Sequence, residues 1–388
     1  MRFLDYVSIN PKISLEKERI YPFVEMGDVS TSFRNPDKVE YKSFDSGVKF
    51  ADGDTVIARI TPCLQNGKRF YCKNIGKGFG STEYLVFRPK DSSVDNLYLY
   101  YFMNTDFIKE SMVRSMVGAT GRQRVNNDVF SRLDVTFPNI EIQRRIAEIL
   151  STYDDLIENN RKQIKLLEEA AQRLYKEWFV DLRFPGYEDT PIVDGVPEGW
   201  GKAPIDSRIS LLSGYAFKSA QFDSSGEYKI VTIKNVKDGE FDGIDTNRIV
   251  SIPGKMPKHC VLADRDILLS LTGNVGRTCI VNGNNYLLNQ RVAKLQSDIP
   301  AFTYCLFRSS DMFDAMNNLA NGAAQQNLSP IRTGKISILF PADNLLEEFE
   351  RIVGSMISKM LSLRKQCDLL IQARDRLLPK LMSGEIEV

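Results

Sequence analysis

The sequence contains the same arrangement twice, and this duplication limits the possible folds more than any other feature. The alternating, strand-like stretch 133–138 (LDVTFP) corresponds to 336–341 (ISILFP), and a long amphipathic stretch follows each Phe-Pro. A polar turn precedes each of them, GATGRQRVN at 118–126 and NGAAQQNLS at 321–329. A repeat of about two hundred residues is far longer than the period of a solenoid. We therefore predict a duplicated chain of globule, helix, globule and helix.

Each globule is predicted to be a mixed α/β fold. Short alternating strand patterns separated by Gly, Asn and Asp turns dominate both halves, and 21–29 (YPFVEMGDV) corresponds to 228–236 (YKIVTIKNV). Helical spacing occurs at 96–116 in the first half and at 302–320 in the second. The glycine-rich segment GKGFGST (76–82) does not lead into a helix, and we interpret it as a hairpin loop. A chain of 388 residues is long enough for two or three cores.

The two long amphipathic stretches are predicted to be helices with a narrow apolar seam. Their apolar residues alternate by three and four positions, and such a seam must be buried against a partner, of which the other helix is the nearest. Asn160 lies on the seam, either as a register-setting residue or as a partly exposed one. Arg374 interrupts the seam of the second helix, and this seam is expected to stop near Pro379. A plain dimerisation hairpin is the alternative use of such helices. The predicted seam residues are Ile149, Ile164, Leu167, Leu174, Trp178, Val353, Met356, Met360, Leu363, Leu370 and Leu377.

Basic residues gather in two stretches that contain no acid. The chain has 51 Lys and Arg against 50 Asp and Glu, and a net charge of +1 argues against a free-standing nucleic-acid binder. Yet 55–82 contains five basic residues and no acid, and 267–297 contains three and no acid. A solvated face is the alternative interpretation of either stretch alone. Their matching places in the repeat favour a shared role.

Export, membrane insertion and several forms of catalysis are excluded by what the sequence lacks. It has no run of eighteen apolar residues, the stretch MRFLDYVSIN has neither the basic nor the apolar region of a leader, and the six cysteines form no C-x-x-C pair. These features predict a cytoplasmic protein with reduced thiols and no membrane contact. His259 is the single histidine, and GNVGRT (273–278) lacks the lysine and the spacing of a phosphate loop. We therefore predict neither a catalytic residue nor a metal site.

Five stretches of the sequence point to a known family. They are ARITPCLQNGK at 58–68, the central segment at 139–188 that begins NIEIQRRIAEIL, VPEGW at 196–200, NGAAQQNLS at 321–329 and RDRLLPKLMSGEIEV at 374–388. Through them, and across essentially its whole length, the chain resembles the specificity (S) subunit of a type I restriction–modification system. The central segment and the C-terminal stretch are the most distinctive of the five.

The resemblance implies an α/β (α+β) protein with two mixed α/β target-recognition domains and two long helices that pack as an antiparallel coiled coil. Each domain would contact one half of a bipartite DNA target, and the helices would set the spacer between the halves. The expected division is 1–140 for the first target-recognition domain, 141–184 for the central long helix, 185–343 for a linker and the second target-recognition domain, and 344–388 for the C-terminal long helix.

The resemblance also implies a non-catalytic subunit that works with partners. The helices would dock two methyltransferase (modification) subunits, which carry S-adenosylmethionine, and the complex would add restriction or motor subunits that use ATP and magnesium. The chain itself is expected to bind double-stranded DNA and no cofactor. Partner subunits in such a complex supply much of the electrostatic attraction to phosphates, so the near-zero net charge does not count against DNA binding.

Candidate DNA-binding residues follow from the chemistry of base and phosphate recognition. In the major groove Arg and Lys bind guanine and Asn and Gln bind adenine, whereas phosphates accept hydrogen bonds from many donors. Each candidate is equally well a base reader, a phosphate contact or part of a hairpin surface, and the polar turns are equally well caps of local helices. The candidates in the first half are Arg59, Thr61, Gln65, Lys68, Arg69, Arg122, Gln123 and Arg124, and those in the second half are Thr272, Asn274, Arg277, Asn289, Gln290, Arg291, Gln325, Gln326 and Asn327.

Two other functions stay open at this point. One is a self-contained enzyme of the type IIG-like restriction class, which fuses catalytic parts to similar recognition domains. The sequence has no Asn/Asp-Pro-Pro-Tyr/Phe segment of the kind that amino-methyltransferases use, which argues against this function. The other is a coiled-coil assembly scaffold without DNA contact. It predicts that reversing the charges of Arg122 and Arg124 leaves DNA binding by the assembled complex unchanged.

Overall fold

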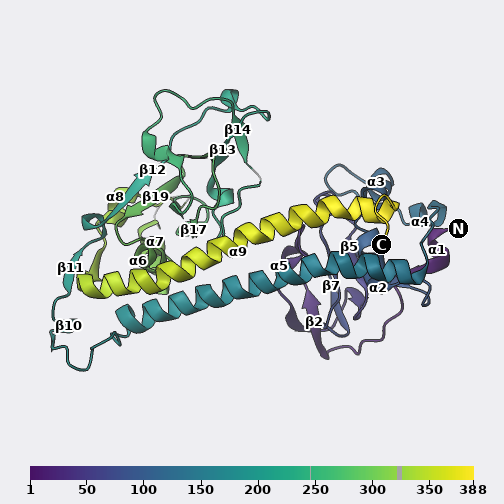
Figure 1. Ribbon diagram of the computed structural model, residues 1–388, viewed down its shortest axis with the longest axis horizontal. Coiled ribbons are helices and arrows are strands. Elements are labelled where there is room, and N and C mark those ends of the chain that lie inside the picture. Colours follow the sequence, from purple (N-terminus) through teal and green to yellow (C-terminus); the bar gives the residue numbers. More distant parts are fainter. Residues whose placement is uncertain (245, 321–325) are drawn as a thin grey trace. The chain divides into compact units, whose positions relative to one another are not determined.

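The structure, a computed structural model, describes all residues except 245 and 321–325. The chain forms two compact units (Figure 1): unit 1 consists of Met1–Arg161 and Gln366–Val388, and unit 2 consists of Lys162–Lys365. Each unit contains one sheet-rich globule and part of both long helices. The predicted mixed α/β fold with two sheet-rich domains is confirmed. In the described part of the chain, no helix is both long and apolar enough to cross a bilayer.

Both long helices form close to their predicted positions. Helix α5 (Ile140–Tyr175) passes into a π-helical turn at Lys176–Val180, and helix α9 spans Asp343–Ser383. Pro379 lies inside α9, which ends four residues later at Ser383, near the predicted end of the seam. A proline removes one backbone N–H donor from a helix, and only the last turn of α9 follows this one.

Unit 1 contains two four-stranded sheets. The first has the order β1-β8-β5-β6 with antiparallel neighbours, and the second has the order β3-β2-β7-β4, in which β2 and β7 are parallel. The strands are β1 (Val7–Ile9), β2 (Ile20–Val24), β3 (Glu40–Ser43), β4 (Val48–Phe50), β5 (Thr55–Ala58), β6 (Arg69–Tyr71), β7 (Gly78–Gly80) and β8 (Tyr84–Pro89). The shorter helices are α1 (Phe3–Tyr6), α2 (Asn96–Phe102), α3 (Asp106–Arg114) and α4 (Asp128–Arg132).

Unit 2 repeats this construction in the same strand order, which confirms the internal repeat. The sheet β12-β19-β16-β17 corresponds to the first sheet of unit 1, and β14-β13-β18-β15, with β13 and β18 parallel, corresponds to the second. The strands of unit 2 are β9 (Ile192–Val193), β10 (Val196–Pro197), β11 (Gly201–Pro204), β12 (Ile209–Ser213), β13 (Tyr228–Val231), β14 (Asn247–Ile249), β15 (Val261–Leu262), β16 (Ile267–Ser270), β17 (Thr278–Ile280), β18 (Tyr286–Leu288), β19 (Val292–Ser297) and β20 (Ser337–Phe340). Its shorter helices are α6 (Pro300–Phe307), α7 (Ser310–Ala320) and α8 (Pro330–Gly334).

The glycine-rich segment 76–82 contains strand β7, so its interpretation as a hairpin loop is wrong. Strand β7 lies between β2 and β4 and is buried along its whole length. A Cβ on Gly78 would lie 2.6 Å from the carbonyl oxygen of Pro22, and one on Gly80 would lie 2.5 Å from that of Val24. Gly78 and Gly80 are therefore required because neighbouring backbones approach β7 closely. A glycine-rich composition alone does not distinguish such a strand from a loop.

The two Phe-Pro segments differ in structure although their sequences correspond. Strand β20 pairs with β11 along all four of its residues. In 133–138, by contrast, the described residues form one isolated bridge, between Asp134 and Arg2, so the expected strand is absent there. Leu133 and Val135 are nevertheless buried. The alternation of apolar and polar residues thus predicts correctly which side chains are buried. A strand forms, however, only where a neighbouring strand is available to pair with it.

The predicted helix seam is only partly buried, and heptad counting missed some of the deepest contacts between α5 and α9. Four of the eleven predicted seam residues are buried and the other seven are half-buried. In unit 1, Leu150 of α5 packs in one cluster with Leu378 and Leu381 of α9. Asn160 is buried, and its amide donates to Gln366 over 3.4 Å. As α5 advances from Leu150 to Asn160, the contacts move backwards along α9, so the two helices are antiparallel within unit 1.

Candidate nucleic-acid interface

In unit 1, three segments that are distant in sequence meet where strand β5 ends. The Arg59 N–H donates to the carbonyl oxygen of Glu83 at 2.8 Å, and the Val125 N–H donates to that of Arg59 at 2.9 Å. The N–H and the hydroxyl of Thr61 both donate to the carbonyl oxygen of Gln123, at 2.9 and 3.1 Å. These bonds join the first acid-free stretch to the first polar turn. We call this meeting point the unit 1 junction.

Unit 2 has an equivalent meeting point, the unit 2 junction, built from the same backbone hydrogen bonds. The Leu271 N–H donates to the carbonyl oxygen of Arg291 at 3.0 Å, and the Leu328 N–H donates to that of Leu271 at 2.7 Å. Thr272 forms an isolated antiparallel bridge with Asn327 of the polar turn. Leu271 follows β16 and Arg291 precedes β19, and these strands are the equivalents of β5 and β8. The first polar turn and the described residues of the second, 326–329, are therefore held beside the ends of equivalent strands, β5 and β16.

Several basic candidates of unit 1 are engaged by the protein itself. The side chains of Lys68, Arg69 and Arg59 donate to backbone carbonyl oxygens at 2.6, 2.7 and 3.0 Å. The Nε atoms of Arg59 and Arg69 are buried without a hydrogen-bond partner in the part of the chain that the structure describes. Gln65 and Arg122, by contrast, are exposed. The acid-free stretch thus supplies loop-stabilising contacts as well as surface charge.

The unit 1 junction also contains an ion pair between Arg124 and Glu83. Arg124 Nε lies 2.9 Å from Glu83 Oε2, and Arg124 Nη2 lies 2.6 Å from Glu83 Oε1. The two side chains are 47% and 23% exposed, so the pair lies at the surface. The hydrogen bonds from Arg124 lower the pKa of Glu83, and the pair is therefore ionised at neutral pH.

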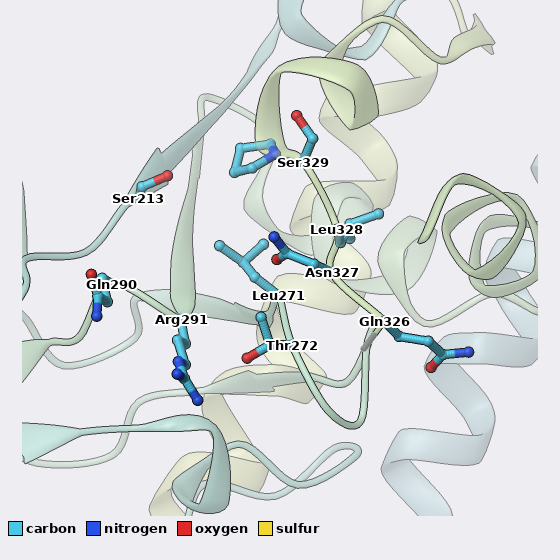
Figure 2. Close-up of a pocket in the computed structure, with 10 residues that line it drawn as sticks. Ser213, Leu271, Thr272, Gln290, Arg291, Gln326, Asn327, Leu328 and Ser329 are labelled. Carbon is cyan, nitrogen blue, oxygen red and sulfur yellow. The ribbon is translucent and has the colours of Figure 1, made fainter. Parts of the chain in front are cut away.

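The unit 2 junction opens into a surface hollow of about 810 Å³. It is lined by Ser213 at the end of β12, by Gln290 and Arg291 before β19, and by the polar turn from Gln326 to Pro330 (Figure 2). Thr272 also lines it, and its hydroxyl is buried with no hydrogen-bond partner among the residues described. Hydroxyl, amide and guanidinium groups together suit the donors and acceptors of a base edge or of a phosphate.

The remaining candidates of unit 2 are placed differently. Asn289 supports the junction, because its side-chain oxygen accepts from the Arg291 N–H at 3.3 Å. Asn274 and Arg277 lie in the turn between β16 and β17 and are not among the residues that line the hollow. Gln325 lies outside the described residues. The structure therefore gathers part of the predicted set at each junction and leaves the rest beside it.

The chain is similar to proteins of one family over most of its length. Residues 8–169 match the Type I restriction modification DNA specificity domain. The chain is 25% identical to the type I restriction enzyme MjaIX specificity subunit of Methanocaldococcus jannaschii, over 77% of this chain and 71% of the relative. It is 23% identical to the type I restriction enzyme HindI specificity subunit of Haemophilus influenzae, over 94% of both chains. The chain is thus similar, over most of its length, to type I restriction enzyme specificity subunits.

A solved specificity subunit shares the fold. The crystal structure of the type I restriction-modification S subunit from M. genitalium matches with a TM-score of 0.56 at 17% sequence identity, covering 98% of this chain and 95% of that chain. At this level of identity the likeness concerns the fold. The resemblance predicted from five short stretches of sequence is confirmed by the family match and the relatives.

Two polar residues at the junctions of this chain were missed by sequence reasoning. Glu83 is the first acid after the acid-free stretch 55–82, and this sharp change of charge was a usable signal. Ser213, which lines the unit 2 hollow, ends an ordinary strand pattern that offers no such signal. Both residues reach their junction through the strands β8 and β12, whose pairing partners the sequence pattern does not specify.

Proposed function

We propose that this specificity subunit recognises a bipartite DNA sequence for a type I restriction–modification complex, with one junction facing each half of the target. The observation that carries the proposal is the pair of junctions, which share their backbone hydrogen bonds and differ in their exposed side chains. An asymmetric two-part target requires such a scaffold, because contacts from side chains to base edges carry the sequence information. The relatives are named specificity subunits, which favours neither the self-contained enzyme nor the DNA-free scaffold.

The proposed complex contains partners that supply the chemistry. Two methyltransferase subunits carrying S-adenosylmethionine would dock on the long helices, and restriction or motor subunits that use ATP and magnesium would join them. This chain would bind double-stranded DNA and no cofactor, and it would be non-catalytic. The names of its relatives, which describe subunits of type I restriction enzymes, support assembly with further subunits.

The long helices are proposed to set the spacing between the two half-sites. At ~1.5 Å per residue, the 36 residues of α5 and the 41 residues of α9 correspond to about 54 and 62 Å of helix. Inserting one heptad into each helix adds about 10 Å. Because one turn of DNA, about ten base pairs, spans roughly 34 Å, the target is expected to keep its two halves and to gain about three base pairs between them. An unchanged gap contradicts the spacer role.

Methylation mapping tests the proposed function. Genome-wide adenine methylation is compared between a host that expresses this chain with its methyltransferase and one that expresses the methyltransferase alone. A split motif that appears only in the presence of the chain is expected. Replacing residues 1–140 by the corresponding region of another family member should then change one half of the motif and leave the other intact. Identical methylation with and without the chain contradicts the proposal and favours a scaffold role.

A further inference from the structure

The two junctions carry different side chains at equivalent backbone positions. The residue before β8 is Glu83 and the residue before β19 is Arg291, and each accepts the same backbone hydrogen bond from the segment after β5 or β16. In the polar turns, Arg124 and Asn327 each form an isolated antiparallel bridge to that segment. Glu83 of unit 1 therefore corresponds to Arg291 of unit 2, and Arg124 corresponds to Asn327.

The ion pair of unit 1 leaves one edge of the Arg124 guanidinium open. Glu83 accepts from Nε and from one N–H of Nη2. Nη1 and the second N–H of Nη2 form the outer edge, which has no partner among the residues that the structure describes. The side chain is 47% exposed, so a large partner can reach this edge. Two neighbouring N–H donors on a planar guanidinium match the O6 and N7 acceptors of guanine.

We propose that Arg124, held in position by Glu83, reads a guanine in the half-site that unit 1 recognises. This inference rests on the proposed function of the chain in DNA recognition. The outer edge of the guanidinium donates to O6 and N7 of the guanine in the major groove, and the charge-assisted bonds to Glu83 fix its plane. Glu83 is a positioning residue, since it acts through Arg124. Its negative charge also weakens the attraction of Arg124 for phosphates, which favours base contacts over sequence-independent ones.

Unit 2 is built to read something else at this position. Asn327 replaces Arg124, and an amide pairs with N6 and N7 of adenine. Arg291 replaces Glu83, so the carboxylate that orients the arginine in unit 1 has a cationic counterpart in unit 2. The base that faces this position is therefore expected to differ between the two halves of the target, as an asymmetric target requires.

The test measures base discrimination by the assembled complex. The full chain with its methyltransferase is given duplexes in which each position of the wild-type motif is varied in turn, and methylation of each duplex is measured. For Arg124→Lys, which keeps the charge and loses the planar fork, preference for guanine at one position of one half-site should fall roughly tenfold or more. Glu83→Gln should reduce the same preference by a smaller factor, because the guanidinium keeps its donors and loses its support. Preferences at the other positions should not change.

Arg114→Lys is the matched control, because Arg114 is an exposed arginine of the same unit that also pairs with a glutamate, Glu110, at 2.6 Å. It should leave every preference unchanged. A unit 1 half-site without guanine, unchanged discrimination in Arg124→Lys, or a uniform fall at all positions would overturn the inference, because a uniform fall identifies a phosphate contact. In all three cases the split motif still depends on the chain. Absence of any chain-dependent motif would instead refute the proposed function itself.

Discussion

Both units tie a tyrosine of the globule to a carboxylate of helix α5, but they take the neutralising cation from different parts of the chain. In unit 1 the Tyr101 hydroxyl donates to Asp154 at 2.5 Å, and the Arg374 guanidinium of α9 also lies 2.5 Å from this carboxylate. The side chains of Arg374 and Asp154 are only 3% and 2% exposed. Burial opposes the charge of Arg374, but the nearby carboxylates outweigh this effect and raise the pKa of Arg374, so the guanidinium keeps its positive charge.

In unit 2 the equivalent tyrosine is Tyr304 of α6, whose hydroxyl donates to Glu168 at 2.9 Å. The cation that pairs with Glu168 is Arg308, which directly follows α6 and belongs to the same globule as the tyrosine. Arg308 also lies 3.1 Å from the exposed carboxylate of Asp238. The side chains of Arg308 and Glu168 are 13% and 16% exposed, so this pair keeps more contact with water than its counterpart.

The comparison teaches that the carboxylate bound by the tyrosine takes its cation from the last helix of the chain in unit 1, whereas in unit 2 it takes the cation from the globule. Arg374 and Asp154 are separated by 220 positions in the sequence and Arg308 and Glu168 by 140, but Arg308 lies only four positions from Tyr304. Removing the cation from a buried carboxylate is strongly destabilising, and access of water reduces the loss. Substitutions in the two clusters are therefore expected to have unequal effects.

Arg374→Met should have the largest effect, because it leaves Asp154 buried and unpaired. We expect unit 1 to lose about 3–5 kcal/mol of stability while unit 2 is unaffected. Hydrogen exchange of the amides in β5 and β16 measures the two units separately. The double variant Asp154→Leu/Arg374→Met removes both charges and should recover most of the loss. An equal loss in both units, or no recovery in the double variant, would contradict this account.

Arg308→Met should destabilise unit 2 by a smaller amount, roughly 2 kcal/mol, because Glu168 can still be hydrated. We expect faster hydrogen exchange of the β16 amides and unchanged exchange of the β5 amides. Arg351→Met is a suitable control, since Arg351 lies in the same unit and pairs with Glu348 at 3.6 Å on the exposed face of α9. A loss as large as that of Arg374→Met would remove the distinction between the two clusters.

Tyr101→Phe should cost less than either loss of a cation, because Arg374 continues to neutralise Asp154. The hydroxyl makes one hydrogen bond to a charged acceptor, and its removal is expected to destabilise unit 1 by about 1.5 kcal/mol. The effect is measured by unfolding the protein in denaturant while monitoring hydrogen exchange of the β5 amides. Tyr153→Phe provides the comparison, since the half-buried Tyr153 on α5 has no hydroxyl hydrogen bond within the described structure. Equal losses in the two variants would show that the bond to Asp154 contributes nothing specific.

Sequence periodicity predicted the elements of this molecule but not the long-range pairs that join them. The heptad spacing indicated both long helices, yet it treated Arg374 as an interruption of the seam. The role of Arg374 becomes visible only when α9 is placed beside Asp154, a residue outside the apolar pattern. A polar pair inside an apolar seam has no periodic signature, because each member is compatible with solvent on its own.

The candidate interface was predicted to a similar extent. The acid-free stretch and the polar turn were recognised separately, and the structure joins them through backbone bonds such as that from Val125 to Arg59. Glu83 lies at the unit 1 junction only because β8 pairs with β5. Its ion pair with Arg124 also requires a turn about forty residues further along the chain. Local composition indicates which segments carry polar donors, whereas strand pairing decides which donors share a site.

The smallest expected effect concerns the junctions, where unit 1 has an acid and unit 2 has Arg291 at the equivalent position. Hydrogen bonds from Arg124 hold the pKa of Glu83 below its ordinary value of 4.5. A carboxyl group whose pKa is lower in the folded state contributes stability that is present above its unfolded pKa and is lost as the pH falls through the folded value. After correction for intrinsic exchange rates, the Val125 amide should therefore lose protection as the pH falls below about 4.5, whereas the Leu328 amide should not. The change should be small because the ion pair is exposed. Glu83→Gln should abolish this difference between the junctions, and its persistence would mean that another acid controls the turn.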